Sequence, residues 1–377
     1  MRRIHAVVLA AAALPVLVIA PADAQDYACV VPSSIPAPET PPELSELRRY
    51  ATGRGVRVAV VDTGVAPNPE LDQLRPARDF VADDPLLDCD SHGTVVAGII
   101  GGTTLGVAPG AELISIRQTS AHYRDTSSGD DAAGGNLQTL TDAIHTAVDE
   151  GARVINVSVV SCVAPSVASR IDDSGLIAAL DRAERSGAVV VAAAGNLSQD
   201  CEPGFTVFPA AYPTVLAVGA RSGTHAVAQY SMEAPLSATG VVPAALSSSG
   251  GGWADGTLAA DGVRPYAGTS FAAPVVSGSV ALVLERSPHL SPKQVRELVA
   301  AAAEPGGGAV DPLAVVTQLQ PAAVPARETL VVNPSAVAVS ESPLRLRDLV
   351  IALFGVVALA LTVLPAASRW RSARPRG

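Results

Sequence analysis

Three short segments of the 377-residue chain carry residue types that together perform nucleophilic catalysis. Asp62-Thr63-Gly64 follows an apolar run, Ser91-His92-Gly93-Thr94 opens another, and Gly268-Thr269-Ser270 leads into a third. A serine hydroxyl becomes a nucleophile when a histidine takes its proton and an acid orients that histidine. We therefore expect Ser270 to be a nucleophile, His92 its base and Asp62 the orienting acid.

Each segment also has an ordinary structural explanation. Serine is a favoured N-cap, so Ser270 can stand there only to begin a helix. Asp-Thr-Gly also occurs in aspartic proteases, but those pair two aspartates and this chain has one such tripeptide. Most histidines are surface residues, and His92 differs because a glycine follows it and a helix is predicted to start at it. An α/β-hydrolase needs its serine first and within G-x-S-x-G, whereas here the serine comes last and residue 272 is alanine.

A serine mechanism also needs a donor for the oxyanion that forms on the attacked carbonyl. Asn196 ends the apolar run VVVAAAGN, where its side-chain amide can point toward the same edge of a sheet. The alternative is a turn asparagine after glycine. The presence of the other three residues favours the oxyanion role.

Apolar runs of strand length alternate with helical patterns along the middle of the chain. Expected strands lie at 56–61, 111–117, 153–160, 188–194 and 213–220, and expected helices at 137–151, 174–187, 292–304 and 311–319. Such alternation predicts an α/β fold of three layers, with a mostly parallel twisted sheet and helices on both faces. Sites in such folds gather at the carboxyl ends of the strands. The polar stretch 118–136 is expected to form a long exposed loop.

Five motifs, VAVVDTGV, DSHGTVVAGI, GVAPGAELISIR, VVVAAAGN and YAGTSFAAPVVSG, resemble the subtilisin-like serine proteases, or subtilases, over residues 50–320. More narrowly, the chain is similar to the mycosins, which are membrane-anchored proteases associated with type VII secretion. The resemblance implies a serine endopeptidase acting on protein substrates, with subunits of a secretion complex as partners. It also implies that Ser158-Val159-Val160 and Ala193-Ala194-Gly195 flank the substrate pocket. A structural role in that complex, with proteolysis dispensable, is the alternative.

The chain departs from the family pattern at three places. Val160 stands where many subtilases have glycine, so specificity is not transferable. Phe271 replaces the methionine that is common after the serine, which removes an oxidisable thioether. Fewer than 40 residues separate the expected signal cleavage from Asp62, too few for a folded inhibitory prodomain.

The two ends of the chain predict export and anchoring. Residues 1–24 read as a signal peptide cleaved after Ala22-Asp23-Ala24, with an uncleaved anchor as the alternative. A proline-rich arm (25–49), either strapped to the surface or a disordered leader, precedes the catalytic domain (50–320). A linker (321–348), an uncharged transmembrane helix (349–367) and an arginine-rich cytoplasmic tail (368–377) follow. These features predict a single-pass type I protein of the cell membrane, with its catalytic domain outside the cytoplasm.

Charge and cysteines limit the partners. Residues 25–348 keep 35 of the 36 acidic residues but lose six of the 26 basic ones, which moves the net charge from −10 to about −15 and argues against nucleic acid. Four cysteines without a C-x-x-C spacing argue against zinc and redox sites. Cys29–Cys89 and Cys162–Cys201 are the favoured disulfides because they close the shortest loops, although four cysteines allow three pairings. We expect no cofactor or metal, and although many subtilases bind calcium, no acidic cluster suggests its ligands.

Overall fold

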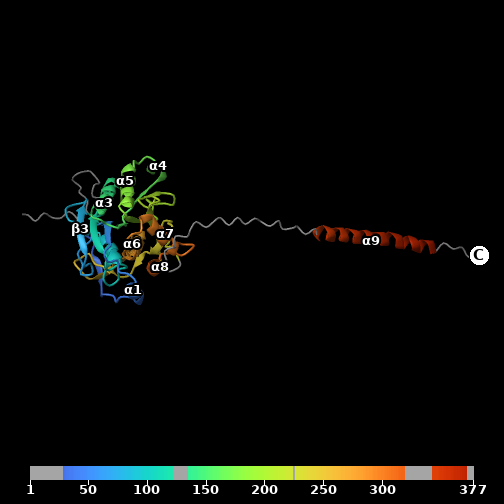
Figure 1. Ribbon diagram of the computed structural model, residues 1–377, viewed down its shortest axis with the longest axis horizontal. Coiled ribbons are helices and arrows are strands. Elements are labelled where there is room, and N and C mark those ends of the chain that lie inside the picture. The colour runs from blue at the N-terminus through green and yellow to red at the C-terminus, as the bar shows by residue number, and fades with distance from the viewer. Residues whose placement is uncertain (1–28, 123–134, 224–225, 319–341, 372–377) are drawn as a thin grey trace, which may run out of the picture. The chain divides into compact units, whose positions relative to one another are not determined.

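The computed structural model describes residues 29–122, 135–223, 226–318 and 342–371. The chain divides into two units, residues 1–320 and 321–377. The first unit holds every element from β1 to α8, and the second holds α9. Figure 1 shows the chain coloured from blue at its N-terminus to red at its C-terminus.

A seven-stranded sheet forms the middle layer of the first unit, and every neighbouring pair of its strands is parallel. Across the sheet the order is β10 (Leu236–Thr239), β9 (Val215–Arg221), β7 (Val189–Ala193), β5 (Val154–Val157), β2 (Arg57–Asp62), β4 (Glu112–Arg117) and β3 (Leu74–Asp79). Strand β2 shows why the apolar run is continuous. Val58 and Val60 face one core cluster while Ala59 and Val61 face the other, and all four are fully buried.

Helices cover both faces of this sheet. On one face α3 (Leu137–Asp149) packs beside α5 (Ser174–Arg185), as Figure 1 shows. On the other lie α2 (His92–Gly101), α6 (Thr269–Arg286), α7 (Pro292–Ala302) and α8 (Pro312–Thr317). The predicted α/β fold, with a mostly parallel sheet between two helical layers, is confirmed.

Local sequence determines where several of these helices begin. Asn136 caps α3 by accepting the Thr139 N–H through its side chain, while its own backbone N–H donates to the Thr139 hydroxyl. Ser291 and Gln294 form the same reciprocal arrangement at α7, with Pro292 as the first helical residue. Such capping boxes satisfy N–H groups that the helix itself leaves unpaired. Helix α7 begins at residue 292, where the sequence predicts that it begins.

Short antiparallel strands lie outside the main sheet, and most of them were not predicted from the sequence. The larger set pairs β1 (Pro32–Ile35), β13 (Trp253–Ala259), β14 (Gly262–Ala267) and β11 (Val241–Val242) in that order, with β12 (Ala245–Leu246) also on β13. A second pair joins β6 (Ser161–Val163) to β8 (Thr206–Phe208), and α4 (Pro165–Ala168) follows β6.

The proline-rich arm is fastened to the domain. Its β1 pairs with β13, α1 (Pro42–Leu47) follows, and a disulfide joins Cys29 to Cys89. The backbone N–H of Val30 also donates to the Cys89 carbonyl at 2.9 Å. The alternative of a detached leader is therefore wrong for residues 29–47, while the signal peptide lies outside the described residues.

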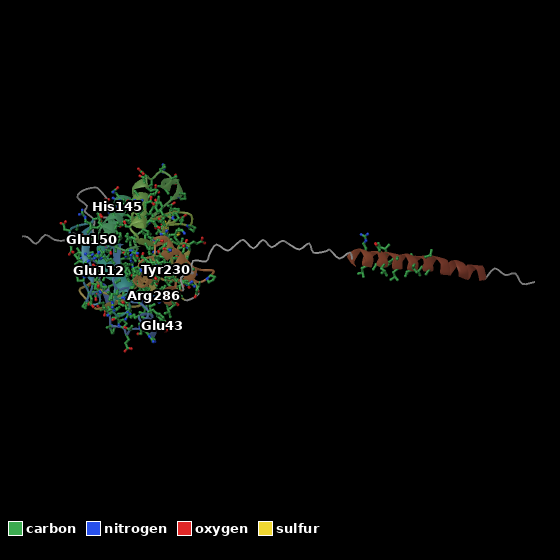
Figure 2. All side chains as sticks on the ribbon, viewed as in Figure 1. Glu43, Glu112, His145, Glu150, Tyr230 and Arg286 are labelled. Carbon is green, nitrogen blue, oxygen red and sulfur yellow. A yellow bond between two sulfur atoms is a disulfide. The ribbon has the colours of Figure 1, made fainter. Side chains whose placement is uncertain are left out.

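The amino ends of the strands carry exposed ion pairs. Arg75 pairs with Glu112 and lies 3.5 Å from Glu150, and Arg57 donates to Glu112 at 3.1 Å. Figure 2 labels Glu112 and Glu150 on this flank of the domain. These pairs occupy the edge of the sheet opposite to the one where Asp62 ends β2.

The second unit contains α9 (Ser342–Arg371), onto which the predicted transmembrane segment 349–367 falls. Side chains of this helix are described from residue 346 to residue 361, so part of the predicted segment lies outside them. Among the side chains that are described, no helix of this protein is both long enough and apolar enough to cross a membrane.

Candidate active site

The four residues singled out for chemistry occupy element ends. Asp62 is the last residue of β2, His92 is the first residue of α2, and Ser270 is the second residue of α6. Asn196 follows β7 by three positions. The two strands that lead to Asp62 and Asn196 are parallel members of one sheet, so both residues emerge at its carboxyl edge.

Asp62 and His92 form a close pair. Asp62 Oδ1 lies 2.6 Å from His92 Nδ1, with the carboxylate fully buried and the imidazole side chain 24% exposed. The same oxygen accepts the Thr63 backbone N–H at 2.8 Å. A carboxylate at this position requires a proton on Nδ1 and leaves Nε2 as the nitrogen that can take one.

The pKa of His92 reflects opposing influences. Burial lowers it, but the charge and hydrogen bond of Asp62 raise it, and Asp88 and Asp90 raise it further. The net pKa lies above the ordinary value of 6.5. The site is therefore built to hold an imidazolium once the histidine has accepted a proton.

Ser270 is not the N-cap of its helix. Helix α6 starts at Thr269, and its N-cap is Gly268, which has no side chain to cap it. Ser270 therefore lies in the first turn, where backbone N–H groups have no partner within the helix. The purely structural explanation that the sequence allowed for this serine, a capping hydroxyl, does not apply.

A buried chain of hydrogen bonds holds the Ser270 backbone. Ser158 Oγ donates to the Ser270 carbonyl at 2.8 Å and accepts from Asn156 Nδ2 at 2.9 Å. Ser277 Oγ in turn donates to Asn156 Oδ1 at 2.8 Å. The chain ties the end of β5 to two turns of α6, so it fixes the backbone on which the Ser270 side chain stands.

Asn196 presents one end of its amide. Its Oδ1 accepts from the Thr269 N–H at 3.0 Å and the Thr269 hydroxyl at 3.2 Å. That leaves Nδ2, the donating end, for a ligand. A Cβ at Gly268 would lie 3.2 Å from this nitrogen, so glycine keeps the space beside the donor open.

A cavity of about 510 Å³ joins these groups. His92, Asn196 and Ser270 all line it, as do the predicted pocket residues Ser158, Val159, Val160 and Gly195. Ala193 and Ala194, predicted with them, are instead buried and are not among the lining residues. Of these three residues at or just after the end of β7, Gly195 alone lines the cavity, because Ala193 and Ala194 pack into the core clusters.

The cavity is also lined by residues that the sequence analysis did not assign to the substrate pocket. They include Gln118, Thr119, Ser161, Ser198, Asp200 and the disulfide Cys162–Cys201. The favoured pairing of the cysteines was the one signal that placed this region near Val160. The structure joins the cysteines in both favoured pairs.

The ring of Phe271 packs against the imidazole of His92. Its ring centroid lies 5.1 Å from that of His92 and 5.9 Å from that of Tyr266. The residue after the serine thus packs against the imidazole. Across the described ranges, no group of three or more His, Cys, Asp or Glu side chains is arranged to hold a metal ion.

Comparison with known proteins gives a consistent result. The model of the subtilase family matches residues 53–327. Mycosin-1 of Mycolicibacterium smegmatis is 36% identical over 320 residues, which cover 73% of this chain and 71% of that protein.

Two solved structures show the same relationship. The MycP3 protease from the type VII (ESX-3) secretion system has a TM-score of 0.71 and 34% identity, covering 78% of this chain and 93% of that one. A chain in an intact ESX-5 inner membrane complex has a TM-score of 0.70 and 30% identity, covering 91% of this chain and 94% of that one.

Proposed function

Because this chain belongs to the subtilase family and is a serine endopeptidase, we propose that Ser270 is its nucleophile, His92 its base and Asp62 the acid that orients the base. The observation that carries the assignment is the 2.6 Å contact between Asp62 and His92, beside a cavity that His92 shares with Ser270. The three residues take the roles of a Ser-His-Asp triad.

In this mechanism the Ser270 oxygen attacks the carbonyl carbon of the substrate while His92 Nε2 accepts the hydroxyl proton. The carbonyl electron pair moves to oxygen, where Asn196 Nδ2 and the Ser270 N–H donate to it. Collapse of this intermediate breaks the C–N bond, and His92 returns the proton to the leaving amine. Water, deprotonated by the same histidine, then attacks the acyl carbon, the bond to the Ser270 oxygen breaks, and His92 passes the proton to that oxygen.

The substrate is a polypeptide in extended conformation. Ser158, Val159, Val160 and Gly195 line the cavity beside Ser270, and this supports their role in binding the residue that precedes the cut. Ala193 and Ala194 contribute only as a buried support behind Gly195.

Labelling with a fluorophosphonate tests the assignment, since this reagent reacts with activated serines. Purified full-length protein is expected to be labelled, with the tag on the peptide containing Ser270. Ser270→Ala should abolish labelling while keeping the unfolding temperature of the wild type. An unlabelled but folded wild type would contradict the triad.

The similarity to mycosins and to a chain of an ESX-5 inner membrane complex supports a place in type VII secretion. The protease would process exported proteins beside that complex and would contact its subunits. A second function, stabilising the complex without cleavage, is favoured by the same likeness to an assembled complex. A strain that carries Ser270→Ala in place of the wild-type gene distinguishes the two functions. If export is retained in this strain but lost when the gene is deleted, the structural role is assigned.

The uncharged run from Leu349 to Ala367, followed by Arg369, Arg371, Arg374 and Arg376, supports an anchor in the cell membrane with the protease domain outside. Disulfides in the domain fit that side of the membrane. Deleting residues 349–377 should release the protease from washed membranes. Continued sedimentation of the truncated protein with membranes would contradict the anchor.

A further inference from the structure

A second buried carboxylate lies behind the acid–base pair. Asp88 is 5% exposed and accepts three hydrogen bonds. The Thr63 hydroxyl donates to Oδ1 at 2.8 Å, and the Thr94 N–H and hydroxyl donate to Oδ2 at 2.8 and 2.7 Å. Thr63 directly follows Asp62, and Thr94 lies two residues after His92, so Asp88 contacts the neighbours of both.

Asp88 also takes over the capping of helix α2. The N-cap residue is Ser91, whose backbone lies in the left-handed region (φ 60°) and whose side chain makes no capping hydrogen bond. The Ser91 hydroxyl instead lies 3.1 Å from the Tyr266 hydroxyl. Because Asp88 accepts the Thr94 N–H, the position of the helix that starts with His92 depends on this carboxylate.

Further hydrogen bonds join the same two segments. The Thr63 hydroxyl accepts the Gly93 N–H at 3.0 Å and lies 3.3 Å from Asp62 Oδ1. The Thr94 hydroxyl accepts the Ala66 N–H at 2.9 Å. The loop after β2 and the first turn of α2 are thus cross-linked through two threonines, each of which donates its hydroxyl proton to Asp88.

A cap alone does not require a charge at this position. The pKa of Asp88 is raised to about 6, chiefly because the carboxyl group is buried; its three hydrogen bonds lower the pKa, and the charge of neighbouring Asp62 raises it. Two ionised carboxylates in close proximity repel each other, and a cation that forms beside them offsets this repulsion. The group that becomes a cation here is the imidazole of His92.

We propose that Asp88 is a positioning residue of the acid–base pair. It holds the Asp62 loop against the helix that begins at His92, and its charge stabilises the imidazolium that forms during the reaction. The inference rests on the proposed role of His92 as base. Asp88 is not among the residues that line the cavity, so it acts on the pair from behind and does not contact the substrate.

The other titratable groups around this position are Asp62, Asp90, His92 and Tyr266. Asp90 differs from Asp88 in its contacts, because it accepts from the Ser120 hydroxyl at 2.5 Å and the Ala121 N–H at 2.8 Å. It therefore adds charge near His92 without linking the loop to the helix. Burial raises the pKa of Tyr266, which remains a neutral phenol beside Ser91.

The pH dependence of fluorophosphonate labelling separates the two parts of the proposal. Asp88→Asn keeps the shape of the side chain but removes its charge and two-sided acceptor geometry. The plateau rate at high pH should fall by about 10- to 100-fold, the size expected when reacting groups are misplaced. The acid limb of the profile should move to lower pH, because the pKa of His92 falls when a nearby anion is lost.

Two variants provide matched controls. Asp90→Asn should move the acid limb in the same direction while the plateau stays near that of the wild type. Asp79→Asn removes another carboxylate with a buried side chain, which lies 3.3 Å from Arg117 where β3 and β4 end. It should lower the unfolding temperature and leave the acid limb in place.

If Asp88→Asn does not fold, Thr63→Val removes one of the three hydrogen bonds and retains the charge. Its plateau should fall with little movement of the limb. A folded Asp88→Asn protein with the wild-type plateau and limb would overturn the inference and leave the triad intact. A wild type that is not labelled at all would instead overturn the triad.

Discussion

The two halves of the site differ in how they treat charge. Around His92 the chain places three carboxylates, of which Asp62 and Asp88 are buried. Around Ser270 it places neutral groups, the hydroxyl of Ser158 and the amide of Asn196. Both halves are extensively hydrogen-bonded, so they differ in the charge of their polar groups and not in the number of hydrogen bonds.

The reaction explains this difference. In the proposed mechanism, attack by Ser270 places a positive charge on the imidazole and a negative charge on the substrate oxygen. Preorganised groups of the opposite sign stabilise each charge at no cost of rearrangement during the step. Carboxylates therefore belong beside His92, while helix N–H groups and a neutral amide belong beside the oxyanion. The asymmetry of the site anticipates the charge separation of its transition state.

Removing the charge of the pair should have the largest effect on the acid–base half. Asp62→Asn leaves the size of the side chain nearly unchanged but allows the wrong tautomer of His92. We expect labelling to fall by about 10⁴-fold, the loss typical of a neutralised triad aspartate. A loss of less than tenfold in a folded variant would mean that Asp62 does not orient the base.

Removing or reversing the donor on the oxyanion half should have the next largest effect on the rate. Asn196→Ala removes one donor and should lower the turnover of a peptide substrate by about 10²–10³-fold. Asn196→Asp places a charge of the wrong sign at the same position, so it should be slower than Asn196→Ala. Equal rates for the two variants would show that the sign of this group does not matter.

The neutral chain beneath Ser270 offers a smaller test. Ser277→Ala removes the hydroxyl that holds Asn156, and the turnover of a peptide substrate should fall about three- to tenfold, as expected for one buried hydrogen bond. Ser279→Ala is the matched control, because this buried serine donates only to Val275 of its own helix at 2.8 Å. Identical turnover in both variants would limit the Asn156 chain to a structural role.

The pH profile gives the finest distinction between the halves. In the proposed mechanism neutral His92 is the active form, and its pKa is raised, so the labelling rate should fall as pH decreases through a value above 6.5. Asn196→Ala and Ser277→Ala should leave this limb in place, since they remove no charge. If the acid limb of the pH profile moves in either variant, the division of the site into a charged and a neutral half is wrong.

Much of the site could be predicted because its residues stand at the ends of strongly patterned elements. The apolar run before Asp62 and the one before Asn196 are buried strands, and parallel strands bring their carboxyl ends to one edge. The order of Asp62, His92 and Ser270 then restricted the chemistry to one arrangement.

Other parts lacked a local signal. Strands β11 and β12 are two residues long, and pairing of β1 with β13 joins segments about 220 residues apart, as Pro32 and Thr257 illustrate. Ala193, Ala194 and Gly195 are consecutive small residues that the sequence does not distinguish, and only the packing shows that the two alanines face the core. Asp88 precedes a cysteine in a polar stretch, where nothing in the pattern distinguishes a buried carboxylate from a solvated one.

The disulfide between Cys29 and Cys89 has a consequence for the history of the mature chain. It closes a covalent ring that contains β1, α1 and Asp62, so one cut anywhere between the two cysteines produces fragments that stay attached. Such a nicked molecule would migrate as one species in non-reducing electrophoresis and as two after reduction. Proteolytic maturation within the arm would therefore leave the cleaved segment attached until the disulfide is reduced.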